Sequence, residues 1–360
     1  MRPFAVVILA LLAACSRTGG PAEPAAISPA VTFEAVGDDP DDPAIWVHPG
    51  DPARSLILGT NKAKAPAGAL VVYGLDGKIR QTVSGLDRPN NVDIAKNFTL
   101  GGKTVDLAVV TERNQSRLRA FLIPADGGEL RDVSDLEGLR VFTGERDREA
   151  APMGIAMYRD LAIVSRKTGP SGRYLWQYRL RDNGAGRVRA DKVREFGAFA
   201  GKPGSDDEIE AIAVDEELGY VYYSDENAGV RKYHADPAHP DAGRELAFFA
   251  TSGFQLQREG IAIYATAPGK GYLLVTDQIP GGTRYVVFRR EGEPGSPHDH
   301  SKVLAILTGG ADSSDGIEAT AQPLGPAFPQ GLLVVMNSGA RNFLGFRGAD
   351  VRRAIEARPR

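Results

Sequence analysis

Polar residues at the ends of short apolar segments are the residues of this chain best placed to do chemistry. One set precedes a short apolar segment: Asp41 with Asp42, Asn90 with Asn91, Met153, Glu208 with Glu210, Glu259, and Asp315. A second set follows a longer apolar segment: Lys62, Arg113, Lys167, Glu226, Gln278 and Asn337. Oxygen ligands without histidine or cysteine nearby favour a hard divalent cation, calcium first and magnesium second. Lysine and arginine supply the point charges and the bidentate fork that bind a phosphate.

These residue types predict a site in which metal ions and cationic side chains hold an oxyanion. Several carboxylates in one concave site repel one another unless they are protonated or bridged by cations. A phosphate held there is electrophilic at phosphorus, and a metal-bound water polarised by Glu210, Glu226 or Glu259 can attack it. Taken singly, each residue also fits a turn or a solvated charge. The prediction therefore depends on their recurrence at one position of a repeat.

The repeat is a hairpin that occurs six times. The six longer apolar segments that precede the second set are Leu56–Thr60, Leu107–Thr111, Leu161–Ser165, Tyr220–Ser224, Tyr272–Thr276 and Leu332–Met336. Their starts are separated by 51, 54, 59, 52 and 60 residues, and each segment is preceded by a shorter one. Units of about 50 to 60 residues with three or four antiparallel strands fit a propeller blade. The sequence thus predicts an all-β, six-bladed β-propeller over residues 31–350, whereas a two-domain sandwich would not need the same hairpin six times.

A propeller brings both sets of polar residues to one place. The first strand of each blade lines the central channel and the second runs antiparallel beside it, so the start of one lies next to the end of the other. We therefore expect all these side chains at one mouth of the channel. Acidic residues come mainly from blades one, four, five and six, and the cations come from blades one, two and three.

The N-terminal residues predict export. Arg2 precedes an apolar run, Phe4–Leu12, that is too short to span a bilayer and ends near Cys15, the only cysteine of the chain. We expect a lipoprotein-type signal peptide over residues 1–15, with Cys15 lipidated, and a flexible tether over residues 16–30. The alternative is an ordinary signal peptide with an incidental cysteine. Either way the mature chain is expected outside the cytoplasm and without disulfides, lipid-anchored to the outer membrane or periplasm, or secreted.

Charge, motifs and cysteine content restrict the classes of partner and of catalysis that we expect. The formal net charge of −3 over 360 residues gives no basic field, so we expect no nucleic-acid partner. The sequence lacks a phosphate-cradling glycine loop and a Gly-x-Ser-x-Gly elbow, and its single cysteine excludes thiol catalysis. We expect a monomer whose membrane contact is only the lipid anchor.

Several segments resemble the β-propeller phytase family, from about Glu34 to Phe346. The most specific are Asp41–Pro49 and Arg258–Ile261; the weaker ones include Thr60–Lys62, Asn90–Asp93, Asp225–Glu226 and Asp315–Ile317. The resemblance implies six blades, several calcium ions at the channel mouth, and hydrolysis of phytate (inositol hexakisphosphate) by direct attack of metal-bound water. It assigns phosphate binding to Lys62, Arg113 and Lys167, and calcium bridging to Glu210 and Glu259, with Glu226 nearby. The other calcium ligands that it implies are Asp42, Asn90, Gln278, Asp315 and, by a looser alignment, Glu34.

The sequence also departs from the family pattern. The usual tyrosine beside the catalytic calcium is Met153, which offers no hard oxygen ligand, and the usual acidic residue two places before Glu259 is Gln257. An aspartate expected upstream of Asp315 falls near Gly309. These changes are expected to weaken one or two calcium sites and leave the cations intact.

Three functions follow as hypotheses. The first is a calcium-dependent phosphomonoesterase that hydrolyses phytate or a similar polyphosphorylated small molecule. The second is a calcium-dependent propeller lactonase or esterase, against which the three cations argue, because a neutral ester does not need them. The third is a non-catalytic, ligand-binding surface lipoprotein, which the changes at Met153 and Gln257 keep open.

Overall fold

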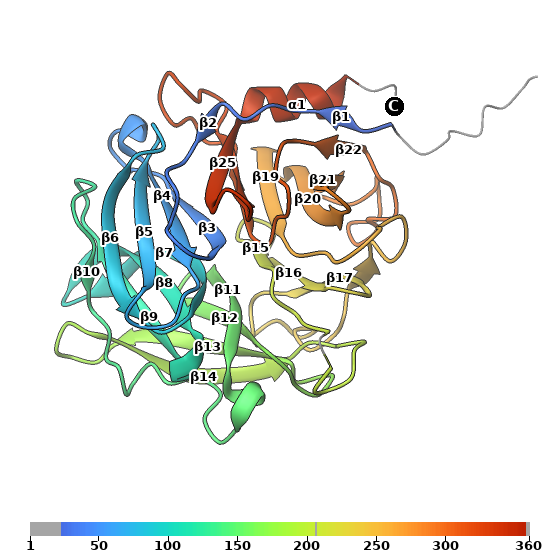
Figure 1. Ribbon diagram of the computed structural model, residues 1–360. Coiled ribbons are helices and arrows are strands. Elements are labelled where there is room, and N and C mark those ends of the chain that lie inside the picture. Colours follow the sequence, from blue (N-terminus) through green and yellow to red (C-terminus); the bar gives the residue numbers. More distant parts are fainter. Residues whose placement is uncertain (1–22, 206, 358–360) are drawn as a thin grey trace, which may run out of the picture.

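The predicted repeats each form one antiparallel sheet, and the sheets stand in a ring around a central channel (Figure 1). The computed structural model describes residues 23–205 and 207–357. The predicted signal peptide and Cys15 lie outside these residues and stay predictions. The six-bladed β-propeller that the sequence predicts is confirmed.

The blades follow one another along the chain, each with its first strand innermost. Blade one holds β3 (Pro40–Trp46), β4 (Leu56–Asn61), β5 (Gly68–Gly74) and β6 (Ile79–Leu86), and blade two holds β7 (Pro89–Leu100), β8 (Lys103–Glu112), β9 (Arg117–Ile123) and β10 (Arg131–Asp132). Blade three holds β11 (Pro152–Tyr158), β12 (Leu161–Arg166), β13 (Leu175–Asp182) and β14 (Val188–Phe196), and blade four holds β15 (Ile212–Asp215), β16 (Tyr220–Asp225), β17 (Gly229–His234) and β18 (Ala247–Phe249). Blade five holds β19 (Ile261–Ala267), β20 (Lys270–Ile279), β21 (Gly282–Arg289) and β22 (Ala305–Thr308), and blade six holds β23 (Ile317–Thr320), β24 (Leu332–Asn337) and β25 (Asn342–Arg347). Short 3-10 turns lie at Pro52–Arg54, Arg113–Gln115 and Asp147–Ala150.

The second strand of each blade has an apolar central segment because both faces of that segment are covered. Every residue of β4, β12 and β24 is buried, whereas the outer strand β6 is mostly exposed. Neighbouring blades pack face to face, and among the described residues one apolar cluster fills each of the six interfaces. A strand buried on both faces reads as a continuous hydrophobic run, which explains the six apolar segments of the sequence.

The ring closes through strands from the two ends of the chain. β2 (Val31–Thr32) pairs with β25 and completes blade six. Phe33, which is 1% exposed, continues from β2 into the interface between blades six and one. Closure of this kind joins the first and last repeats, so the propeller has no free seam.

The predicted tether over residues 16–30 is wrong for its last part. β1 (Ala25–Ala26) pairs in parallel with β22 as a fifth strand of blade five, and Ile27 is buried. The physical reason is that β22 leaves an open edge, which the short apolar segment covers. The C-terminal helix α1 (Gly348–Glu356) lies beside β1 (Figure 1) and buries Val351 and Ile355 against blades five and six. The packed part of the chain thus runs from Ala25 through α1, beyond the predicted limits 31–350.

Within residues 23–205 and 207–357, no helix has both the length and the apolar character that a membrane span requires.

Candidate active site

The same backbone hydrogen bond recurs at the mouth of the channel in every blade. The donor is the residue that follows the second strand, or in blade five the equivalent residue within β20. We call this residue the turn position, and in blades one to six it is Lys62, Arg113, Lys167, Glu226, Gln278 and Ser338. Its acceptor is a carbonyl just before the first strand, which we call the rim position: Asp39, Arg88, Ala151, Glu208, Gln257 and Ser313. Two residues beyond each rim position is the wall position: Asp41, Asn90, Met153, Glu210, Glu259 and Asp315. The N···O distances are 2.7 to 3.2 Å, so the backbone sets the three positions alike in all blades.

The register corrects one sequence assignment. Ser338, not Asn337, takes the turn position of blade six, because its N–H bonds the carbonyl of Ser313. Asn337 instead donates to Asn342 Oδ1 (2.9 Å) and accepts from the N–H of Asp312 (3.1 Å).

Hydroxyl side chains fix one blade to the next below the mouth. Two residues before the turn position stand Thr60, Thr111, Ser165, Ser224 and Thr276. Thr60 Oγ1 donates to the carbonyl of Asn90 in the next blade (2.6 Å), and Thr111 Oγ1 donates to that of Met153 (2.6 Å). The same oxygens accept an N–H of their own blade, at 3.0 Å in both cases. The Thr60 and Thr111 hydroxyls thereby each position a wall residue of the neighbouring blade.

A glycine at the mouth lets two blades approach closely. Gly154 follows Met153, and a Cβ atom there would lie 1.7 Å from the carbonyl oxygen of Glu210 in blade four. Any side chain at this position would push Glu210 away from the mouth.

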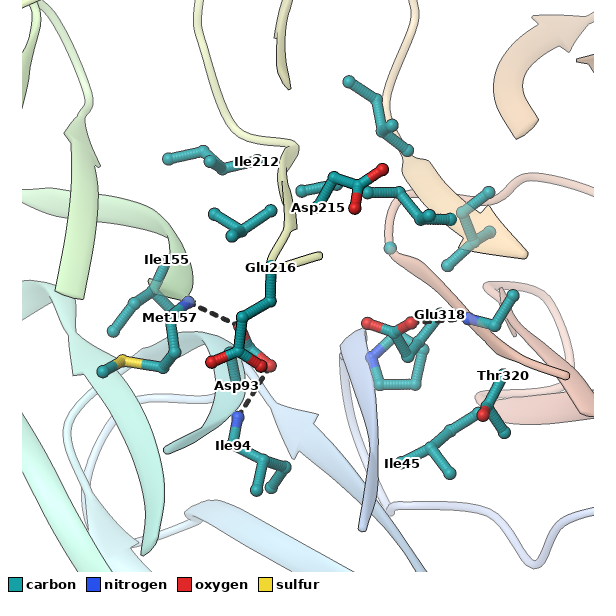
Figure 2. Close-up of a pocket in the computed structure, with 18 of the residues that line it drawn as sticks. Ile45, Asp93, Ile94, Ile155, Met157, Ile212, Asp215, Glu216, Glu318 and Thr320 are labelled. Atoms are coloured by element: carbon teal, nitrogen blue, oxygen red, sulfur yellow. Dashed lines mark hydrogen bonds between the residues drawn. The ribbon is translucent and has the colours of Figure 1, made fainter. Parts of the chain in front are cut away.

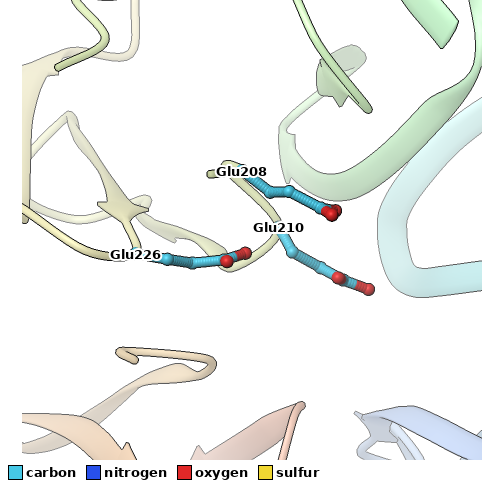
Figure 3. A group of neighbouring side chains, drawn as sticks. All are labelled: Glu208, Glu210 and Glu226. Atoms are coloured by element: carbon cyan, nitrogen blue, oxygen red, sulfur yellow. The ribbon is translucent and has the colours of Figure 1, made fainter. Parts of the chain in front are cut away.

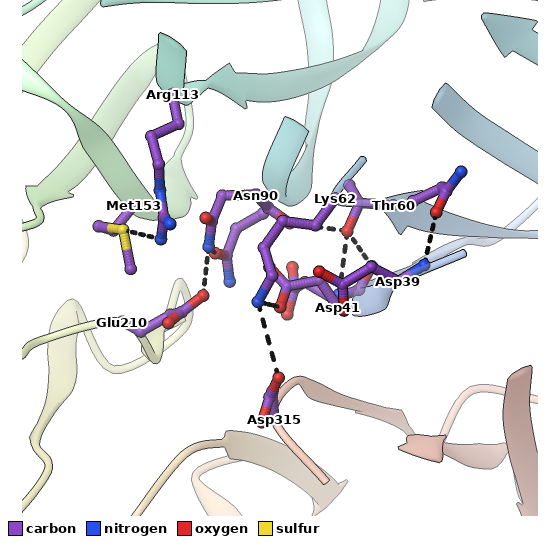
Figure 4. Close-up of polar contacts among 12 residues, drawn as sticks. Asp39, Asp41, Thr60, Lys62, Asn90, Arg113, Met153, Glu210 and Asp315 are labelled. Atoms are coloured by element: carbon purple, nitrogen blue, oxygen red, sulfur yellow. Dashed lines mark hydrogen bonds and ion pairs between the residues drawn. The ribbon is translucent and has the colours of Figure 1, made fainter. Parts of the chain in front are cut away.

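Lys62 lies among carboxylates of blades one and six (Figure 4). Its Nζ contacts Asp41 Oδ1 and lies 3.8 Å from Asp315 Oδ2. Gln278 Nε2 donates to the other oxygen of Asp315 (3.2 Å). Burial alone would lower the pKa of Lys62, but Asp41, Glu210 and Asp315 raise it, so the ammonium stays charged.

Glu210 lies across the mouth from the cations. Its Oε1 accepts from Asn90 Nδ2, so blades two and four meet there (Figure 4). Burial works against its ionisation, but Lys62, Arg113 and Lys167 together with Asn90 hold its pKa below the usual value. One carboxylate is therefore within electrostatic range of all three predicted phosphate-binding cations.

The side chains at the mouth of blades two and three bring Arg113 against Met153. The Arg113 Nη2 atom contacts the Met153 sulfur (Figure 4), and Met153 is fully buried. Arg113 Nε is buried without a hydrogen-bond partner among the described residues. Arg113 thus keeps donor capacity at the mouth.

Three glutamates of blade four form the group best suited to hold a cation. Glu208, Glu210 and Glu226 each offer a carboxylate oxygen within 4.8 Å of the others, and they extend toward a common space (Figure 3). Lys167 Nζ contacts Glu208 Oε1.

Two glutamates at the mouth have raised pKa values. Burial, together with Glu259 and Glu210, raises the pKa of Glu226 well above its usual value. Burial, together with Asp315 and Glu210, raises the pKa of Glu259 to about 8. Crowded carboxylates of this kind are relieved by a divalent cation.

The donor set fits calcium. Asp41 Oδ2 and Asn90 Oδ1 are buried without a hydrogen-bond partner in the described part of the chain. Glu226 is 5% exposed, and no described residue forms a hydrogen bond or ion pair with its carboxylate. Oxygen atoms of carboxylates and amides in irregular arrangement are the ligands that calcium accepts most readily.

Two predicted metal ligands lie outside this group. The Asp42 carboxylate accepts the N–H of Val92 (3.1 Å) and lines the channel below the mouth. Glu34 lies at the outer edge of blade one, where it binds Lys78 (3.0 Å) and the N–H of Ile79 (2.9 Å). The structure does not bring Glu34 together with the other predicted ligands.

Asp39 and Arg88 were not predicted from the sequence, and the structure adds them to the mouth; Asp41 was expected there, without a role of its own. Arg88 has a positive φ of 59°, and its backbone joins Ala63 to Arg113 through two hydrogen bonds of 2.9 and 3.1 Å. The rim positions share no residue type, so only the backbone hydrogen bonds of the structure identify them.

Below the mouth the channel forms a cavity of about 380 Å³. Two of its carboxylates are held by backbone N–H groups (Figure 2): Asp93 by Ile94 and Met157, at 2.6 Å each, and Glu318 by Ala319 at 2.6 Å. Burial raises the pKa of Asp93 to about 6, and burial together with Asp93 raises that of Glu318 to about 8.

Comparison with known proteins identifies the family of this chain. The phytase family model matches residues 17–342. A 3-phytase of Bacillus subtilis (strain 168) is 30% identical over 309 residues, which cover 84% of this chain and 76% of that protein. Among solved structures, regucalcin of Agrobacterium tumefaciens, described as a calcium-binding protein, superimposes with a TM-score of 0.52 at 13% identity, over 90% of this chain and 97% of that one. This last likeness shows the propeller fold alone. The family match spans most of the propeller and includes every mouth position up to Ser338, and the chain therefore belongs to the phytase family.

Proposed function

We propose that this protein is a calcium-dependent phosphomonoesterase that hydrolyses phytate or a similarly polyphosphorylated small molecule. The observation that carries the proposal is the position of Glu210, whose carboxylate lies within electrostatic range of Lys62, Arg113 and Lys167 at one mouth. Cations from blades one, two and three, beside carboxylates from blades one, four, five and six, suit a substrate that bears several negative charges. The similarity to a 3-phytase supports phytate as the substrate.

The cationic side chains bind and orient the phosphate. Arg113 offers a guanidinium fork, and Lys62 and Lys167 offer point charges from either side. Preorganised positive charge is most effective where charge develops on the phosphate oxygens in the transition state. Met153 excludes water behind the Arg113 guanidinium, because it is fully buried and contacts that group.

The glutamates handle the proton of the attacking water. Glu210 stays ionised beside the cations, so it can accept a hydrogen bond from that water. Without a cation, burial with Asp315 and Glu210 holds the pKa of Glu259 at about 8, and a calcium ion that Glu259 ligates would keep this carboxylate ionised.

Calcium would be held by Glu210, Glu226, Glu259, Asp315, Gln278 and Asn90. When bound, it supplies Lewis acidity toward the phosphate oxygens and lowers the pKa of a water that it ligates. The lactonase hypothesis gains no support from the site, since three cations have no role toward a neutral ester.

The first test is free phosphate released from phytate, with calcium and with a chelator. We expect release only with calcium. Lys62→Ala is expected to lower kcat/KM by about 10²–10³-fold, because a charge on the transition state loses its partner. Lys270→Ala, which removes an exposed lysine paired with Glu291, is the control and should keep full activity. Phosphate release that persists in Lys62→Ala would show that the assigned role is wrong.

A second test measures thermal unfolding. Calcium that binds the folded acidic group and not the unfolded chain raises the melting temperature, and a chelator lowers it. A melting temperature that is indifferent to both reagents contradicts the calcium site, whatever the activity shows.

A further inference from the structure

Blades four and five differ in charge at their rim positions. The N–H of Glu226 bonds the carbonyl of Glu208 at 3.2 Å, and the N–H of Gln278 bonds that of Gln257 at 3.2 Å. Glu208 and Gln257 are thus equivalent positions in neighbouring blades. An uncharged amide stands in blade five, and the carboxylate of this pair stands in blade four.

The Glu208 carboxylate is directed into the same space as two others. It lies within 4.8 Å of ligand oxygens of Glu210 and Glu226, and Figure 3 shows the three side chains extending from adjacent segments of blade four. Glu226 gives an independent reason to expect a cation there. Its side chain is 5% exposed, points into the group, and receives no hydrogen bond from any residue in the described ranges.

Lys167 already uses one oxygen of Glu208. Its Nζ contacts Glu208 Oε1, and both side chains are mostly shielded from water, at 24% and 11% exposure. An ammonium paired in this way has part of its charge neutralised and is less able to bind a phosphate. A divalent cation among the three glutamates and the Lys167 ammonium therefore compete for one carboxylate.

We propose that Glu208 is a further ligand of the cation at this mouth, and that cation binding releases Lys167 from Glu208 to bind phosphate. This inference rests on the proposed function. It makes the binding of cation and phosphate mutually favourable, because each removes the partner that the other must displace. Under this proposal, blade four contributes more carboxylate ligands to the cation than blade five does.

The experiment is calorimetric titration of calcium into the wild-type protein and Glu208→Gln. We expect calcium affinity to fall about tenfold or more in Glu208→Gln, since a charged ligand is lost. Glu195→Gln is the matched control, because it breaks a Lys–Glu contact with Lys192 on blade three, away from the mouth. That control should bind calcium as the wild type does.

A second readout is binding of inorganic phosphate with calcium chelated. Glu208→Gln should bind phosphate more tightly than the wild type, because Lys167 is free. Calcium should strengthen phosphate binding in the wild type by a larger factor than in the variant. A Glu208 that served only to hold the loop would leave phosphate affinity unchanged or lower.

Lys167→Met provides a third measurement, whose result does not depend on whether Glu208→Gln folds. Removal of the competing ammonium should raise calcium affinity, and the gain should shrink when Glu208→Gln is also present. Unchanged calcium affinity in both single variants overturns the inference. A wild-type protein that binds no calcium overturns the proposed function itself, so the two failures are distinguishable.

Discussion

At the scale of single residues, the surroundings of each carboxylate decide how it behaves. Glu210 and Glu318 have the same side chain, yet their pKa values move in opposite directions. Glu210 faces three cations, whereas Glu318 faces Asp93 in the channel. Type and spacing in the sequence identify such residues, but only the packed structure supplies the sign of the shift.

The raised pKa of Glu318 predicts a pH-dependent loss of stability. The folded protein keeps the proton up to about pH 8, whereas the unfolded chain releases it near the usual 4.5. The loss of folding stability caused by Glu318 is therefore absent below about pH 4.5 and grows as the pH rises toward 8. We expect Glu318→Gln to be more stable than the wild type by about 1–4 kcal/mol at pH 8, and by much less at pH 5.

Urea unfolding at both pH values, with a chelator present, measures this difference. Glu137→Gln is the control, because that exposed carboxylate has its pKa lowered by Arg140 and carries no such penalty. Equal stability of Glu318→Gln and the wild type at pH 8 would contradict the assignment.

At the scale of the strands, buried hydroxyls set one blade against the next. Thr111 Oγ1 accepts the N–H of Asn91 and donates to the carbonyl of Met153. Thr111→Val leaves both backbone groups without a partner, so we expect a loss of about 1–3 kcal/mol in the free energy of unfolding. Phosphate affinity should also fall, because Met153 lies against Arg113.

The chain offers a matched control for this prediction. Thr283 is 3% exposed, and its hydroxyl has no hydrogen-bond partner among the described residues. Thr283→Val should therefore be neutral or stabilising in chemical denaturation. Equal effects of the two substitutions would show that the hydroxyl hydrogen bonds do not position the blades.

The sequence predicts the strands better than their ends. The apolar second strands and the six-fold repeat were sufficient for the propeller, because burial on both faces leaves a continuous hydrophobic run. The sequence does not distinguish Asn337 from Ser338, since both are small and polar, and only the hydrogen-bond register separates them. β1 was missed for a different reason: Ala25–Ala26 has no strand pattern of its own and becomes a strand only by pairing with β22.

The site residues likewise divide into those that the sequence predicts and those that only the packed structure places. Lys62, Arg113 and Lys167 were predicted from their shared position and meet the acidic residues as expected. Glu34 was predicted from an alignment alone, and its partners Lys78 and Ile79 belong to the outer edge of blade one. No local pattern reports which side of a blade such a loop residue faces.

At the scale of the whole molecule, the ends of the chain complete the last two blades. β2 pairs with β25 and β1 with β22, and Phe33 packs against Tyr73 with ring centroids 5.3 Å apart. Removal of residues 1–32 should lower the melting temperature by about 5 °C or more, because blade six loses its outer strand. Removal of residues 1–22 leaves β1 and β2 in place and is the control. Identical melting curves for the two truncations would contradict a stabilising role for the closure.

The rim positions have a consequence for engineering. Each is fixed through its carbonyl oxygen, so the backbone bond does not depend on the side chain, and blade three folds with alanine there. Asp39, Ala151, Gln257 and Ser313 can thus be varied together in a combinatorial library, whereas Arg88 has a left-handed backbone and Glu208 is the proposed cation ligand. Selection from such a library would change which anions bind at the mouth, blade by blade, while the strands of the propeller stay the same.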